Sequence, residues 1–504
     1  MLQQNKIKQS YKQRLLVQAV CIIAIALLGM SSCSKSFTDA SANLEGQPAA
    51  STFWQSASDA ESAVNSIYAN LRSWGNVAFP AIAIEETGSD DAEKGSVTSD
   101  ATYFNQYNSF TVTASQSQLD GFWTAQYQNI NYCNQVLDHV DTMSTVSDDD
   151  KVRYLAEARF VRAWSYFRLV RAFGRVPLVL HVPTTAEELN PSQNESSEIY
   201  DSVENDLTIA AAGLPTEVST SELGRATKYA ALALHAKVSM YRENWEDVLT
   251  YTNEVIQSGK YSLFSNFYQL FRIANENNSE SIFEIQCDYV SGDDDISDCQ
   301  YSQVQGNRDA SAGWGFNVPT SNLDSAFETD DPRREYTIMT AGSTTPSGDE
   351  VPAATAGAPT RYNMKSYVPF TVAQATNSGA GQNIRVIRYA EVLLMNAEAN
   401  NELGNTADAL ASLELIRARA RGSNSSILPE VTTTDQTTLQ TAIWNERRVE
   451  LAMEGDRYFD VIRQGRGSTI FGSLGWEANK NEVWPIPQTE IDNSGGVLIQ
   501  NTGY

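Results

Sequence analysis

Residues 147–177 read SDDDKVRYLAEARFVRAWSYFRLVRAFGRVP, and this stretch predicts the class of fold. Ser147 supplies an N-cap, and the three aspartates after it place negative charge in the first turn of a helix. Gly174 and then Pro177 end the helix. Between these signals runs an apolar stripe at helical spacing, formed by Val152, Leu155, Ala156, Ala163, Tyr166, Phe167, Val170 and Phe173. The stretch is therefore predicted to be a long amphipathic helix.

More helices are predicted on both sides of this one. A capping box at Ser58 to Glu61 begins a helix that Gly75 ends. Other amphipathic stretches cover residues 119–140, 197–212 and 438–453.

Two segments read as helical hairpins. Glu243-Asn244 turns the chain in the first, and Leu403-Gly404-Asn405 turns it in the second. Both resemble tetratricopeptide units, whose period is about 34 residues. A generic helical hairpin is the alternative, but the recurrence of such pairs favours a repeat.

Residues 265–384 have a different character. Apolar and polar residues alternate in strand fashion from 281 to 289, and residues 341–359 are rich in Gly, Ser and Thr. Residues 85–118 also read as a long polar loop. Loops on a rigid scaffold commonly carry the binding site. The predicted fold is therefore mainly α, a tetratricopeptide-like helix-pair superhelix with an irregular, loop-rich ligand-binding part that contains short strands.

The N-terminus carries an export signal. Basic residues precede an apolar stretch, 15–29, and the small residues Ser31-Ser32 lead to Cys33. The apolar stretch is too short to span a bilayer comfortably. Residues 30–33 also resemble a bacterial lipobox, in which the cysteine is acylated. We expect residues 1–32 to be a lipoprotein signal peptide, Cys33 to be lipidated and residues 33–51 to be a polar tether. The alternatives are an ordinary secreted protein and an uncleaved anchor helix.

The charge balance excludes one class of partner. The chain has 36 Lys and Arg against 62 Asp and Glu, a net charge of −26. Such a field repels nucleic acid and anionic lipid, so neither is an expected partner. A neutral ligand is indifferent to net charge.

Catalytic and metal-binding motifs are missing from the sequence. It contains no His-Glu-x-x-His, no Gly-x-Ser-x-Gly and no Walker phosphate loop. Asp293 to Asp295 with Asp298 could collect a structural Ca²⁺, but they lack the glycine and terminal Glu of an EF-hand, which favours a solvated turn. We expect no cofactor. Cys287 and Cys299 could form a disulfide or remain buried thiols. A binding protein is favoured over an enzyme.

Several segments together resemble the SusD/RagB family of outer-membrane glycan-binding lipoproteins, and the match runs from Cys33 to Tyr504. They are residues 53–68, 157–178, 225–228, 280–286, 331–334, 387–394, 446–460, 485–488 and 500–504. The resemblance implies about four tetratricopeptide-type helix pairs packed against an irregular ligand-binding part. It also implies a lipid-anchored, cell-surface location at the outer membrane and docking on a SusC-like TonB-dependent transporter. Glu446, Arg447, Arg448 and Arg457 are expected in ion pairs between helices.

The expected domain division follows from these signals. Residues 52–264 form the helical N-terminal part, 265–384 an irregular insertion, and 385–504 a C-terminal helical pair and coil of the same domain.

Candidate ligand residues are aromatic side chains in loops. Sugars present C–H faces that stack on rings, while amides and carboxylates bind their hydroxyl groups. The aromatic candidates are Trp74, Tyr103, Tyr289 and Trp314. The polar candidates are Asp90, Asp91 and Asn317. The alternative for each is a structural role, although the glycines on both sides of Trp314 make a core position less natural.

The sequence thus predicts a non-catalytic protein that captures an oligosaccharide or polysaccharide and delivers it to an outer-membrane transporter. One alternative is a capture subunit for peptides or another nutrient. Others are an envelope glycosidase with an unrecognised carboxylate pair, which 62 acidic residues leave open, and a tetratricopeptide scaffold that binds only protein.

Overall fold

The computed structural model describes residues 53–289, 299–376 and 381–504. The signal sequence, Cys33, the tether to residue 51 and Asp293 to Asp298 lie outside the described residues. The chain forms two compact units, Met1–Asp59 and Ala60–Tyr504. The second unit holds every element that follows α2 (Ala57–Leu71).

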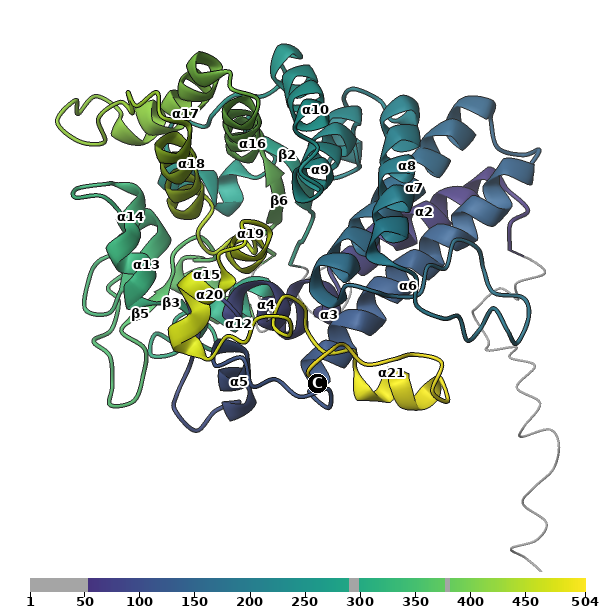
Figure 1. The fold of residues 1–504 in the computed structure, drawn as a ribbon, viewed down its shortest axis with the longest axis horizontal. Helices are drawn as coiled ribbons and strands as arrows, with labels where there is room; N and C mark the ends of the chain where they lie inside the picture. Colours follow the sequence, from purple (N-terminus) through teal and green to yellow (C-terminus); the bar gives the residue numbers. More distant parts are fainter. Residues whose placement is uncertain (1–52, 290–298, 377–380) are drawn as a thin grey trace, which may run out of the picture. The chain divides into compact units, whose positions relative to one another are not determined.

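A row of long helices runs through the second unit (Figure 1). Each helix packs against the next, and α10 meets α16 although the whole insertion separates them in sequence. The short turns after α9 and α16 confirm both predicted hairpins, and the mainly helical fold class is also confirmed. The row consists of α6 (Ser117–His139), α7 (Asp148–Phe173), α8 (Ser196–Gly213), α9 (Lys228–Tyr241), α10 (Trp245–Gln257), α16 (Tyr389–Glu402), α17 (Thr406–Arg421) and α18 (Gln436–Glu450).

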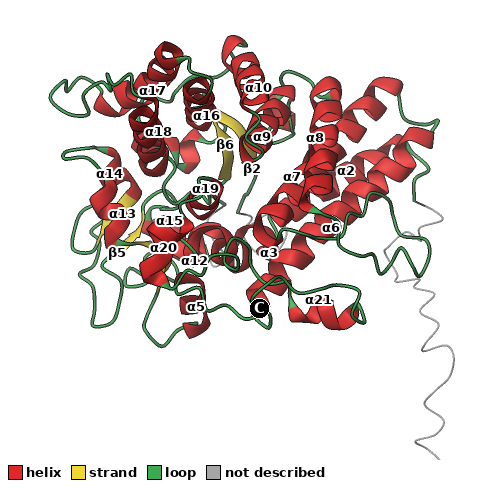
Figure 2. Cartoon of the chain, viewed as in Figure 1, coloured by secondary structure: helices red, strands yellow, loops and turns green. Residues whose placement is uncertain are grey.

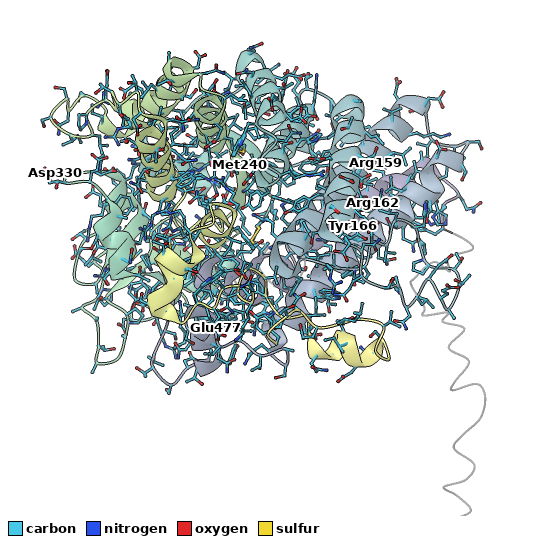
Figure 3. The ribbon with its side chains drawn as sticks, in the orientation of Figure 1. Arg159, Arg162, Tyr166, Met240, Asp330 and Glu477 are labelled. Atoms are coloured by element: carbon cyan, nitrogen blue, oxygen red, sulfur yellow. A yellow bond between two sulfur atoms is a disulfide. The ribbon has the colours of Figure 1, made fainter. Side chains whose placement is uncertain are left out.

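Helix α7 has the ends that its sequence predicts. The Ser147 hydroxyl oxygen accepts a hydrogen bond from the backbone N–H of Asp150 at 3.2 Å, and Gly174 follows the helix with φ of 70°. Almost every residue from the middle of α7 onward is buried, including charged ones. Arg159 and Arg162 both hold Asp206 of α8 at 2.7 Å, so ion pairs as well as apolar contacts join the two helices (Figure 3).

The capping box of α2 differs from the prediction. Ser56, not Ser58, accepts from the backbone N–H of Asp59 at 3.2 Å, and the Asp59 carboxylate accepts from the N–H of Ser56 at 2.8 Å. The same spacing of hydroxyl and acidic residues occurs two positions earlier, and that pair forms the box. The helix ends at Leu71, and a separate short helix, α3 (Trp74–Val77), begins the next segment.

Within the described ranges, three two-stranded antiparallel sheets lie among the helices (Figure 2). They pair β1 (Ala92–Gly95) with β3 (Phe316–Pro319), β2 (Ser281–Ile285) with β6 (Ile384–Arg388), and β4 (Ile338–Thr340) with β5 (Arg361–Asn363). The alternating pattern predicts a strand over residues 281–289, but the strand ends at Ile285. Residues 85–118, expected as loop, contain β1 and α5 (Asn105–Asn108), because β1 finds its partner more than two hundred residues away.

Short helices lie between the long helices and the strands. They are α4 (Phe79–Ile82), α11 (Phe267–Leu270), α12 (Tyr301–Gln305), α13 (Ser321–Ala326), α14 (Arg333–Thr337), α15 (Phe370–Ala375), α19 (Arg457–Arg463), α20 (Gly467–Phe471) and α21 (Gln488–Asn493). The insertion has a core of its own, which includes Tyr268, Val318, Met339, Tyr362, Tyr367 and Phe370.

A buried ion network joins the insertion to the C-terminal helices. Glu450 of α18 meets Arg388 at the end of β6 at 2.6 Å, Arg419 of α17 at 2.5 Å and Arg333 of α14 at 3.1 Å. Arg388 also meets Glu280 at 2.7 Å. All of these side chains are almost completely buried. Four separate elements are thus held at one carboxylate.

The four ion-pairing residues predicted near the C-terminus all form such pairs. Arg447 meets Asp460 at 2.7 Å and Glu391 at 2.9 Å. Glu446 pairs with Arg333 and Arg417, Arg448 with Asp91, and Arg457 with Asp90. The prediction of ion pairs between helices is confirmed for Glu446 and Arg447, whereas Arg448 and Arg457 reach the segment before β1.

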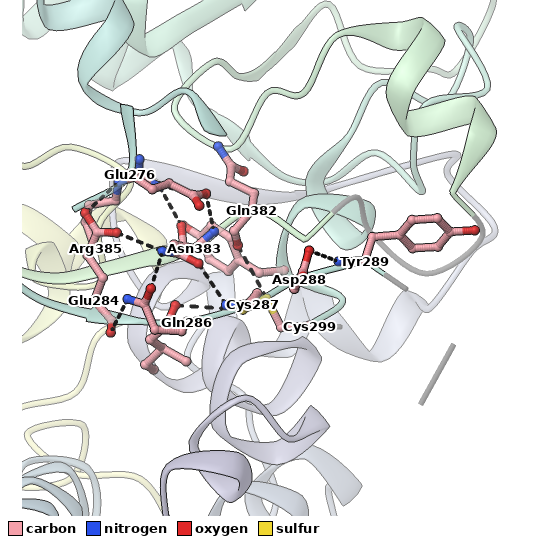
Figure 4. The surroundings of a disulfide bond; sticks show 12 residues. Glu276, Glu284, Gln286, Cys287, Asp288, Tyr289, Cys299, Gln382, Asn383 and Arg385 are labelled. Carbon is pink, nitrogen blue, oxygen red and sulfur yellow. Dashed lines mark hydrogen bonds and ion pairs between the residues drawn. A yellow bond between two sulfur atoms is a disulfide. The ribbon is translucent and has the colours of Figure 1, made fainter. Parts of the chain in front are cut away.

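Cys287 and Cys299 form a disulfide bond (Figure 4). The Asn383 side chain braces it, because its oxygen accepts from the backbone N–H of Cys287 at 2.8 Å while its nitrogen donates to Glu284 and Gln286. Of the two possibilities that the sequence leaves open for this cysteine pair, the structure has the bonded one. Cys133 is a buried free thiol.

Candidate functional site

Two predicted candidates, Trp74 and Trp314, lie side by side. Trp74 begins α3 and is 40% exposed, while Trp314 lies in the loop before β3 and is half-buried. Their ring centroids are 6.1 Å apart. Phe79 of α4 contacts both, at 5.4 Å from Trp74 and stacked at 5.7 Å on Trp314. We call Trp74, Phe79 and Trp314 the aromatic platform.

Buried aromatic rings pack against the platform. Phe79 contacts Phe104 at 5.0 Å and Phe316 of β3 at 4.7 Å, and both of these rings are buried. Tyr103 lies beside Phe104 at 5.5 Å, and its hydroxyl oxygen accepts from the side-chain amide of Gln118 at 3.2 Å. The structure therefore brings Trp74, Trp314 and Tyr103 to one aromatic cluster. Rings packed on rings have few alternative positions, so the platform is preorganised.

The loop that carries Trp314 is closely packed on its surroundings. A Cβ atom at Gly313 would lie 2.4 Å from the Cα of Gly306, so only glycine allows this approach. The backbone N–H of Trp314 donates to the Gln303 carbonyl at 2.8 Å, and the Gly315 carbonyl accepts from Ser96 at 2.5 Å. The two glycines thus hold the tryptophan at the surface while the backbone on either side is fixed.

The three polar candidates are buried and each makes hydrogen bonds, while the Oδ2 of Asp91 and the Oδ1 of Asn317 have no hydrogen-bond partner among the described residues. Arg457 donates two hydrogen bonds to Asp90, at 2.7 and 3.0 Å, and Arg448 donates to Asp91. Burial alone would raise the pKa of Asp90, but the hydrogen bond and charge of Arg457 hold it below its ordinary value. Asn317 donates to Gln305 at 2.9 Å. These contacts fix β1 and β3 beneath the platform, and direct ligand contact by these residues stays a prediction.

Tyr289 lies two residues after Cys287 of the disulfide bond. It follows the disulfide, points away from it, and its backbone N–H donates to the Asp288 carboxylate at 2.8 Å (Figure 4). It is half-buried and is the last described residue before Cys299. Among the described residues, no ring contact joins it to Trp74 or Trp314. Its role in binding stays a prediction.

Sequence reasoning missed Phe79. The signal for a short element was present, since Pro80 favours the first turn of a helix. Nothing in the sequence pairs this segment with residues near 314, because that contact depends on the β1–β3 pairing.

The described residues of the structure hold neither a helix that could span a membrane nor a cluster of metal ligands. In the part of the chain that it describes, no helix has the length and apolarity that a membrane span needs. Within the same ranges, no three His, Cys, Asp or Glu side chains converge as metal ligands. The acidic turn that could collect a Ca²⁺ is outside those ranges.

Known proteins resemble both halves of the chain. Residues 279–504 match the family model described as "SusD family", and residues 43–240 match the one described as "Starch-binding associating with outer membrane". "SusD-like protein P2" of Formosa agariphila is 27% identical over 95% of this chain and 98% of its own. A solved "Laminarin binding SusD-like protein" is 28% identical, with a TM-score of 0.78 over 89% of this chain and 100% of its own. "Surface glycan-binding protein A" from Bacteroides thetaiotaomicron, 23% identical, shares the fold with a TM-score of 0.77 over 90% of this chain and 100% of its own.

A scaffold of packed helices that presents a rigid aromatic platform, together with these matches, defines a class of binding proteins rather than of enzymes. The chain belongs to the SusD/RagB family, whose members are non-catalytic glycan-binding proteins associated with the outer membrane. Membership confirms the resemblance seen in the sequence, and it also confirms that the protein is not an enzyme.

Proposed function

We propose that this protein captures an oligosaccharide on the aromatic platform. The observation that carries the proposal is the contact between Trp74 and Trp314, two partly exposed indole rings that the fold brings together from distant segments of the chain. Neighbouring tryptophans offer two faces for successive sugar rings. Tyr103, which is half-buried beside the same cluster, adds a hydroxyl group at its edge.

The proposal also covers the membrane anchor of the protein and the transporter with which it works. Cys33 would carry a lipid that anchors the chain in the outer membrane, facing the cell surface. The bound glycan would pass to a SusC-like TonB-dependent transporter, on which the protein docks. The lipobox-like segment and the family resemblance support this extension.

Titration calorimetry on the chain without residues 1–33 tests the platform, because those residues lie outside the unit that carries it. Laminarihexaose and maltohexaose are the probes, chosen from the ligands that relatives' names mention. Trp74→Ala should weaken binding of the preferred probe about thirtyfold, since truncating a central anchor costs about 2 kcal/mol. The melting temperature should hardly change because the ring is 40% exposed.

Trp245→Ala is the matched control, since Trp245 is a partly exposed tryptophan at the start of α10. It should leave the affinity unchanged. Equal affinities for wild type and Trp74→Ala would contradict the platform. Binding of unrelated peptides but of no hexaose would favour the alternative of peptide capture.

Membrane fractionation tests the anchor. Cys33→Ala in the full chain should release the protein from the membrane fraction, because lipidation needs that thiol. Cys133→Ala serves as the control and should leave the protein in the membrane, since Cys133 is buried in the fold. Unchanged membrane association of Cys33→Ala would rule out the lipid anchor.

A further inference from the structure

A cavity of about 240 Å³ lies beside Trp314, and we call it the side cavity. It lies between α12, the loop with Gly313, strand β5 and helix α15. Trp314 therefore belongs to both the platform and the side cavity. The lining also includes Gln305, Asn307, Tyr362, Asn363, Ala373 and Gln374.

The lining has a distinctive chemistry. None of the described residues that line the side cavity carries a charge, although charged residues make up a fifth of the chain. Aromatic rings and side-chain amides dominate it instead. A hard cation selects carboxylate ligands, and an anion needs basic ones. Rings with amides suit a neutral molecule that has C–H faces and many hydroxyl groups.

Two buried polar groups in this lining have no partner. Asn307 and Tyr362 are each 1% exposed, yet within the described residues the Nδ2 of Asn307 and the hydroxyl of Tyr362 make no hydrogen bond. Buried polar atoms are nearly always paired. The Oδ1 of Asn307 accepts from the Ala310 N–H at 2.7 Å, which fixes the orientation of this amide. Asn307 and Tyr362 both line the side cavity, and both unpartnered groups are hydrogen-bond donors.

The neighbouring amides are held by the protein itself. The Gln305 oxygen accepts from Asn317 at 2.9 Å and from Asn363 at 2.8 Å, which fixes the Gln305 and Asn363 side chains in the lining. At the rim, the exposed Gln374 donates to the Ala310 carbonyl at 2.7 Å. The lining thus combines buried, unpartnered donors with an exposed rim.

We propose that the side cavity binds a single sugar ring of a glycan whose other rings lie on the aromatic platform. The proposal rests on the proposed function. The volume of the cavity far exceeds the about 30 Å³ of one water and falls below the about 300–1,000 Å³ of pockets for drug-sized ligands. Asn307 and Tyr362 donate to hydroxyl oxygens of the inserted ring, which is either a chain end or a one-sugar branch.

Tyr362→Phe is the central test, because it removes only the unpartnered hydroxyl. Loss of an unpaired buried hydroxyl should leave the melting temperature unchanged or raise it. Affinity for the preferred hexaose should fall about tenfold, since the inserted ring loses a buried hydrogen bond. Ala373→Leu, which narrows the side cavity from α15, should weaken binding similarly. Tyr336→Phe is the matched control, because Tyr336 packs on Tyr268 and does not line the cavity.

The outcomes separate this inference from the proposed function. If Trp74→Ala weakens binding while Tyr362→Phe and Ala373→Leu bind like wild type, the platform stands and the sugar-ring inference is overturned, with water as the occupant. If no probe binds the unmodified protein, both fail. A loss of affinity with an unchanged melting curve in Tyr362→Phe supports the inference.

Two glucans distinguish the source of the ring. A linear laminarihexaose and an otherwise equal oligosaccharide with a one-glucose branch are titrated into wild type and Tyr362→Phe. If Tyr362→Phe loses the same affinity for both glucans, the inserted ring is a chain end. A preference for the branched glucan that disappears in Tyr362→Phe identifies a branch.

Discussion

At the scale of the residue, Glu86 is the carboxyl group that most clearly links pH to stability. Burial, together with the nearby charges of Glu85, Asp456 and Glu454, raises its pKa from 4.5 to about 8. The folded protein therefore holds this group in its neutral form at pH values where the unfolded chain ionises it. The stability gained in this way is fully present below about pH 4.5 and is lost as the pH rises through about 8.

Glu86→Gln should remove this dependence. Melting temperatures of wild type and variant should be similar at about pH 5, and the variant should be the more stable protein at about pH 9, because glutamine has no proton to lose. Thermal unfolding across this range measures the effect. Parallel curves for the two proteins would mean that Glu86 is already ionised in the folded state.

Single residues also show how far the sequence could predict the site. Trp74, Tyr103 and Trp314 were predicted as ring candidates because each lies beside glycines or in a polar stretch. Their meeting was not predictable, since it depends on β1 pairing with β3 across more than two hundred residues. The burial of Asp90 and Asp91 was not predictable either, because their partners Arg457 and Arg448 come from the other end of the chain.

At the scale of the element, Glu450 holds four pieces of the fold together. Burial would raise its pKa, but the charges of Arg419, Arg388 and Arg333 hold it well below its ordinary value. Glu450→Gln should destabilise the protein by about 3 kcal/mol or more, because three buried guanidinium groups lose their shared partner. Denaturant unfolding monitored by circular dichroism measures the change.

Glu217→Gln provides the comparison. Glu217 pairs with Lys260 at 2.6 Å, but both side chains are largely exposed, so no measurable change is expected. If the two variants lose the same stability, the buried network contributes no more than a surface pair.

The helices themselves were the most predictable elements. The bounds of helix α7 agree with its N-cap, its apolar stripe and its closing glycine, all of which are local signals. The insertion was predicted only as irregular with short strands, because each of its strands has three to five residues and pairs with a distant partner. Local periodicity carries little information over such lengths.

At the scale of the whole molecule, many arginines of the described residues are buried in ion pairs. Arginines in every part of the fold have side chains less than a tenth exposed and are engaged in ion pairs. They include Arg162, Arg168, Arg171, Arg333, Arg385, Arg388, Arg417, Arg419, Arg447, Arg457 and Arg463. Their partners include buried carboxylates such as Glu280, Glu450 and Asp460, so these buried charges largely cancel. The excess of 62 acidic over 36 basic residues in the chain therefore sets the field around the protein.

The net negative charge of the protein predicts that it binds neutral glycans more tightly than acidic ones. A hexaose oxidised to carry uronic acids should bind more weakly than its neutral parent at low salt, and the difference should shrink as salt screens the repulsion. Affinity for the neutral hexaose should hardly depend on salt. Titrations at about 20 and 500 mM sodium chloride measure both effects. Stronger binding of the acidic sugar at low salt would refute the prediction.

The excess of acidic residues therefore matters beyond stability. It surrounds the protein with a negative field that acts on a charged polymer before any ring contacts a sugar. Sulfated and uronate-rich polysaccharides would approach it slowly and leave it readily, whereas uncharged ones would meet no such barrier. The charge balance of the chain would thus select among polysaccharides before any contact is made.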